Sequence, residues 1–140
     1  MLCVCAGSSV DQQSNNVSLF SLVERINVPA MVTPPGNGAI PVEAHTYWKF
    51  DAKEMQRELH VRYVMVNLDT RLETSSDTLK HRAVTTRMRS RLGGIPFPPV
   101  AGNYELRVDW RWDEQDDWTR TEQAWPLAIS EGQPQPRVTH

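Results

Sequence analysis

One short stretch near the C-terminus alternates strictly between apolar and charged residues. Residues 104–112 read YELRVDWRW, with an aromatic or aliphatic residue at every second position. Successive side chains of a β-strand point to opposite faces, so this period of two predicts a strand with one buried face and one wet face. An amphipathic helix would need a period near 3.6, which the stretch does not have. The chain is therefore expected to build a sheet that is solvated on one side.

Other parts of the chain also have strand character. These are residues 2–10, 17–28, 40–50, 59–69, 80–92 and 118–130. Residues 17–28 also fit helical spacing, but a strand paired as a hairpin with the first is favoured. Prolines and glycines interrupt residues 29–38 and 93–102, which we interpret as loops. Residues 51–58 are expected to form at most one or two helical turns.

Together these patterns predict an all-β fold, an antiparallel two-sheet sandwich of about seven strands. Residues 1–130 would form a single domain, and residues 131–140 a flexible C-terminal tail. Residues 59–69 are apolar on both faces in their second half, which suggests that this half is covered on both sides or twisted between the sheets. If residues 80–92 lie beside residues 104–112, their charges would form a ladder across the sheet surface.

Two stretches resemble a known family. They are CAGSSVDQQSNNVSLFSLVERINVP at residues 5–29 and GIPFPPVAGNYELRV at residues 94–108. Together they are similar to a family of uncharacterised bacterial proteins, a domain of unknown function. The resemblance implies an immunoglobulin- or C2-like sandwich and favours the strand interpretation of residues 17–28. It implies no activity.

Composition excludes some partners. The net charge is −2 and the pI is near 6.1, so we expect no nucleic-acid partner. No apolar run is long enough to span a membrane. Cys3 and Cys5 are too few for a zinc site without two further ligands, and no histidine pair has metal spacing. We interpret them as buried apolar residues in a reducing compartment, and expect a cytoplasmic protein without cofactors.

The densest group of carboxylates lies between the last two expected strands. It consists of Asp113, Glu114, Asp116 and Asp117. Calcium prefers several oxygen ligands at once, so this turn is a candidate metal site. The alternative is a solvated hairpin tip.

A second candidate is the basic strip formed by Arg87, Arg89 and Arg91, which share one strand face. The strip either pairs with acids across the sheet or recognises an acidic partner or a phosphate-bearing ligand. Trp48, Trp118 and Trp125 are the third candidate. Exposed tryptophans can stack on sugar rings or anchor protein interfaces.

No stretch specifies a reaction. The histidines are scattered, and no serine or cysteine has an evident base beside it. We therefore expect a non-enzymatic protein-interaction or assembly module, whose partner is another protein or a second copy of the chain. The alternative is a ligand-binding sandwich that takes carbohydrate through its tryptophans or calcium through the acidic turn.

Overall fold

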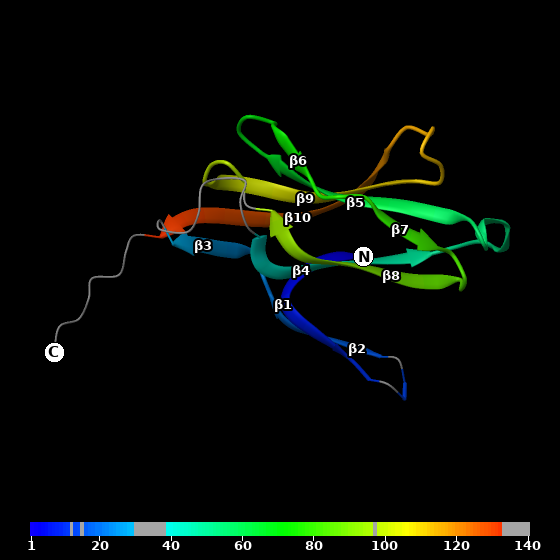
Figure 1. Ribbon diagram of the computed structural model, residues 1–140. Helices are drawn as coiled ribbons and strands as arrows, with labels where there is room; N and C mark the ends of the chain where they lie inside the picture. The colour runs from blue at the N-terminus through cyan, green and yellow to red at the C-terminus, as the bar shows by residue number, and fades with distance from the viewer. Residues whose placement is uncertain (12, 15, 30–38, 97, 133–140) are drawn as a thin grey trace.

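The computed structural model describes residues 1–11, 13–14, 16–29, 39–96 and 98–132, and within them the chain is all-β (Figure 1). The described residues form ten strands and one 3₁₀ turn, η1 (Ala52–Glu54). The strands are β1 (Leu2–Val10), β2 (Val17–Leu22), β3 (Arg25–Pro29), β4 (Ala39–Lys49), β5 (Glu58–Asn67), β6 (Glu73–Ser75), β7 (Leu79–Arg82), β8 (Arg87–Pro96), β9 (Gly102–Arg111) and β10 (Thr119–Gly132).

The first sheet has the strand order β2-β1-β4-β8, and all its pairs are antiparallel. We call it sheet A. The far ends of β1 and β2 form a hairpin that projects from the rest of the molecule (Figure 1). β8, which carries the arginine strip, lies at the end of this order.

The second sheet, sheet B, has the order β3-β10-β9-β5-β6, with β7 also paired to β5. The alternating strand predicted at residues 104–112 is β9, at the centre of this sheet. Its apolar side chains Tyr104, Leu106 and Val108 are buried. This part of the prediction is confirmed.

One hydrophobic core joins the two sheets. It combines side chains of sheet A, such as Val4 and Ile40, with side chains of sheet B, such as Leu59 and Leu106. A buried polar contact crosses the same space, where the Tyr63 hydroxyl lies 2.8 Å from Thr46 Oγ1. Buried hydroxyls need such partners, and this contact links a strand of sheet A to a strand of sheet B.

The structure corrects the expected strand count and pairing. Residues 80–92 are not one strand, since β7 ends at Arg82 and belongs to sheet B while β8 belongs to sheet A. The chain crosses between the sheets around Ala83, which is fully buried. Alternation shows which face of a strand is buried, but it does not show which strand lies beside it. The pairing of the arginine strip with residues 104–112 that was considered above is wrong. The partner of β8 is β4.

Residues 17–28 are extended, as expected, but they also divide. β2 pairs with β1 as the predicted hairpin, whereas β3 joins sheet B and runs parallel to β10. The sheets are therefore not purely antiparallel. Ser21 has a positive φ of 54°, a conformation that bends the backbone shortly before this division.

Some expectations lie outside the described residues, namely most of the proline-rich loop at 29–38 and the tail beyond residue 132. Cover on both faces in the second half of residues 59–69 is confirmed, because Val64, Met65 and Val66 are all buried. In the part of the chain that the structure describes, no helix could cross a membrane.

Candidate functional site

A cavity of about 740 Å³ lies against sheet A. Its floor comes from β4 and β8, and part of its wall from the far half of β1. The lining residues are Ser8, Val10, His45, Tyr47, Trp48, Lys49, Arg87, Met88, Arg89 and Arg91. We call this cavity the basic groove.

The register of β4 and β8 brings the charged residues of the groove together. Tyr47 pairs with Arg89, and Lys49 pairs with Arg87. Directly paired residues point to the same face, and residues two apart share it, so these side chains form consecutive rows. The predicted basic strip thus gains a lysine and a tyrosine that the sequence did not associate with it.

These rows gather positive charge on one face of sheet A. Within the described part of the chain, no carboxylate forms an ion pair with Lys49, Arg87 or Arg89. Like charges directly opposite each other on neighbouring strands are destabilising, and Lys49 and Arg87 are such a pair. The groove therefore attracts negative charge.

One acidic residue anchors the inner end of the groove. Glu43 accepts a hydrogen bond from the Ser8 hydroxyl at 2.6 Å and forms an ion pair with Arg91, whose Nε lies 2.9 Å from the carboxylate. Nε2 of His45 lies 3.1 Å from the same carboxylate. These contacts, chiefly the one from Ser8, hold the pKa of Glu43 below its usual range. Arg91 is consequently held in place, while the other two arginines remain available.

Behind the groove, two cysteines face the glutamate and the histidine. Cys3 pairs with His45 and Cys5 pairs with Glu43 across β1 and β4. Donor atoms of Cys5, Glu43 and His45 all lie within 4.8 Å of one another. Burial raises the pKa of the Cys3 thiol, which therefore lacks the thiolate character of a nucleophile. The sequence alone does not reveal this group. Cys3 and Cys5 are two residues apart, as are Glu43 and His45, but the two pairs come together only through the register of β1 with β4.

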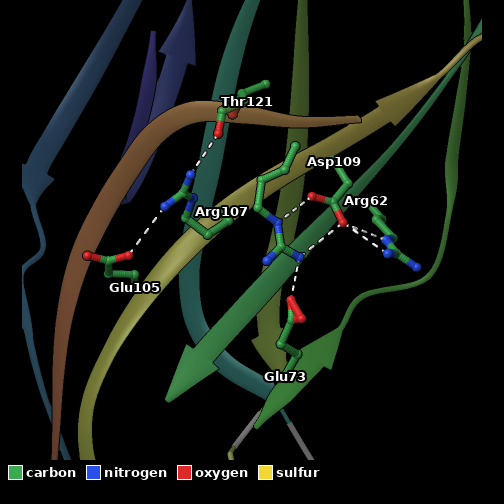
Figure 2. Close-up of polar contacts among 7 residues, drawn as sticks. Arg62, Glu73, Glu105, Arg107, Asp109 and Thr121 are labelled. Carbon is green, nitrogen blue, oxygen red and sulfur yellow. Dashed lines mark hydrogen bonds and ion pairs between the residues drawn. The ribbon is translucent and has the colours of Figure 1, made fainter. Parts of the chain in front are cut away.

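A second polar assembly lies on the outer face of sheet B (Figure 2). The carboxylate of Asp109, only 2% exposed, accepts hydrogen bonds from Arg62 Nε at 3.0 Å and Arg120 Nε at 2.8 Å. Arg120 also forms an ion pair with Glu73, and the bonds to Asp109 raise its pKa further. These contacts join β5, β9 and β10, so we interpret the assembly as structural.

The same face holds the ladder residues expected beside the arginine strip. Arg107 donates to the Thr121 carbonyl at 2.9 Å and lies 3.5 Å from Glu105, as Figure 2 shows. The charged ladder exists, but β5 and β10 are its partners rather than β8.

The three candidate tryptophans lie in different places and are all half-buried. Trp48 lines the basic groove, and its indole donates to Ser90 Oγ at 2.7 Å. Trp125 donates to the Val23 carbonyl at 2.6 Å and packs against the core. Guanidinium groups of Arg62 and Arg111 lie over the Trp118 ring, 4.4 and 4.1 Å from its centroid. The structure does not bring the three together.

The acidic turn is exposed at all four of its candidate positions, Asp113, Glu114, Asp116 and Asp117. Glu114 forms an ion pair with Lys80 at 2.8 Å. The Asp113 carboxylate accepts the backbone N–H of Gln115 at 2.9 Å. Across the described residues, the turn contributes no set of three metal donors within mutual reach. The arrangement is that of a solvated hairpin tip.

Comparison with protein-family models, with curated proteins and with solved structures finds no match to this chain.

Proposed function

We propose that this protein is a non-enzymatic binding module that recognises an extended acidic segment of a partner protein in the basic groove. The observation that carries the proposal is the row of Lys49, Arg87 and Arg89 without carboxylate partners among the described residues. Holding cations together without counter-charges costs stability, which a bound anionic ligand would offset.

The spacing of the arginines favours a peptide. Arg87, Arg89 and Arg91 are successive outward positions of one strand, so they repeat about every 6.7 Å. An extended peptide with an acid at every second residue has the same repeat. Val10, Met88 and Trp48 add apolar lining, and Tyr47 adds an aromatic ring. Such a mixture suits a polypeptide better than a free phosphate.

A phosphate-bearing ligand and a nucleic acid are the alternatives for a basic groove. The net charge of −2 favours a local contact over a long polyanion. Inorganic phosphate and single-stranded DNA therefore serve as competitors in the test below.

The test measures fluorescence polarisation of a labelled peptide in which glutamate alternates with threonine. The double variant Arg87→Glu, Arg89→Glu should weaken binding at least about tenfold, or about 1.4 kcal/mol. Its control, Arg25→Glu with Arg71→Glu, makes the same charge change at exposed positions outside the groove lining. Equal loss in both variants, or stronger binding of phosphate or DNA, would refute the proposal.

A second copy of the chain is a possible partner of the same chemistry, through its exposed acidic turn. Size-exclusion chromatography with light scattering distinguishes self-association from the binding of a different protein. Mass that rises with concentration, and falls in the groove variant, would assign the groove to self-assembly.

We also propose the finer architecture and setting. Two sheets that share one core support a sandwich of the immunoglobulin- or C2-like kind, in the bacterial family that the sequence resembles. A member of that family would need to share the parallel pairing of β3 with β10. The two buried thiols suit a reducing, cytoplasmic compartment. An experimental structure and fractionation of cells would test these points.

A further inference from the structure

Four side chains with metal-binding donors occupy two neighbouring rows of sheet A. Cys3 lies opposite His45, and Cys5 lies opposite Glu43. Paired side chains have Cβ atoms about 5 Å apart, and residues two apart share a face. The four residues therefore form a square on one face of the sheet.

Three of the four side chains of this square bring their donor atoms close together in a largely enclosed place. Those of Cys5, Glu43 and His45 lie within 4.8 Å of one another, and ligands of a tetrahedral zinc ion are about 3.5 Å apart. Cys5 is fully buried and His45 is 2% exposed, while the Glu43 side chain is 12% exposed. We propose that Cys3, Cys5 and Nδ1 of His45 form a binding site for a zinc-like divalent metal ion, with the Glu43 carboxylate holding Nε2 of the same imidazole.

The imidazole of His45 is the second observation that points to a ligand. Its Nε2 contacts Glu43, but its Nδ1 is buried and has no hydrogen-bond partner among the described residues. A buried polar atom left unpaired costs free energy, so such atoms usually have a partner. Metal-binding histidines place one ring nitrogen on the ion and the other on a carboxylate or carbonyl. The environment of His45 matches this division.

The charges of the site balance around a divalent ion. Two thiolates and one carboxylate supply three negative charges. The ion and the Arg91 guanidinium, 2.9 Å from Glu43, supply three positive charges. Binding would release the two thiol protons, because thiolates rather than thiols are metal ligands.

The donor set also selects the type of metal. Two sulfurs and one imidazole nitrogen suit zinc, whereas magnesium and calcium prefer oxygen alone. His45 lines the basic groove, so an ion can reach the site from there.

Titration of the reduced, metal-free chain with Co²⁺ tests the site, because thiolate ligands give cobalt an intense charge-transfer band. One equivalent should saturate the band. His45→Leu should weaken Co²⁺ binding at least tenfold, whereas His81→Leu, the same change at a half-buried histidine outside the square, should bind normally. No saturable band, or equal binding by both variants, would overturn the proposal.

A second measurement keeps the test decisive if His45→Leu does not fold. X-ray absorption of the zinc-loaded native chain should show a mixed first shell of sulfur with nitrogen or oxygen. A shell without sulfur would overturn the proposal. This outcome is independent of peptide binding, which is tested separately by the arginine variants.

Discussion

Lys49 on β4 and Arg87 on β8 lie directly opposite each other at the outer end of the basic groove, although both are cations. In the described chain neither has a carboxylate partner. Cross-strand pairs of opposite charge are the stabilising arrangement, so this pair lowers the stability of the unliganded protein. Residues that serve a binding site often carry such a cost.

Replacing Lys49 should therefore separate stability from binding. Lys49→Glu changes a repulsive pair into an attractive one and should raise the free energy of unfolding by about 0.5 kcal/mol. The same variant should bind the acidic peptide several-fold more weakly. Urea unfolding and fluorescence polarisation measure the two effects. Lys53→Glu, an exposed change in η1, is the control. A destabilised Lys49→Glu with undiminished binding would contradict the role of the pair.

The Asp109 assembly should affect stability alone. Asp109→Asn removes the charge that Arg62 and Arg120 share, and should cost about 2 kcal/mol because the site is largely buried. Glu105→Gln, on a more exposed and longer pair, should cost less than about 0.5 kcal/mol. Urea unfolding measures both. Peptide affinity should be unchanged in folded Asp109→Asn, and a loss of affinity there would place the ligand elsewhere.

The contact between the sheets offers a double-mutant cycle. The Tyr63 hydroxyl contacts Thr46 Oγ1 at 2.8 Å and donates to the Ser90 carbonyl at 3.3 Å. Tyr63→Phe should cost about 1 kcal/mol of unfolding free energy. Combined with Thr46→Val, the loss should be smaller than the sum of the single losses, because both remove one shared bond. Strict additivity would show that the two hydroxyls do not interact.

His81 should make the protein less stable in mild acid. Burial lowers its pKa below 6.5, so the unfolded chain takes up a proton at this position before the folded chain does. Stability from this residue is present above pH 6.5 and is lost as the pH falls below it. The midpoint temperature of thermal unfolding should fall less steeply between pH 8 and pH 5 in His81→Leu than in the native chain. Parallel profiles would contradict a half-buried histidine that stays neutral in the folded chain.

The elements that follow from local pattern could be predicted from the sequence. β9 and β5 were expected because alternation and apolar runs report burial directly. The division of residues 80–92 was not, since no glycine or proline marks the crossing at Ala83, which is defined only by its burial between sheets. The parallel pairing of β3 likewise depends on contacts with β10, about a hundred residues away.

The candidate sites show the same limit. Arg87, Arg89 and Arg91 could be recognised as one face, but Lys49 and Tyr47 join them only through the register of β4 with β8. Cys3 and Cys5 lacked metal partners in the sequence because Glu43 and His45 lie some forty residues away. Pairing between distant strands, rather than local spacing, brings together the residues of both proposed sites.

The location of the ligand is tested most directly by nuclear magnetic resonance. Titration of the labelled protein with the acidic peptide should shift the backbone amide signals of residues 45–49 and 87–91, together with those of Ser8 and Val10. The amides around Asp109 and in the acidic turn should remain unchanged. Shifts confined to sheet B, or none at peptide concentrations that saturate polarisation, would contradict the basic groove as the binding site.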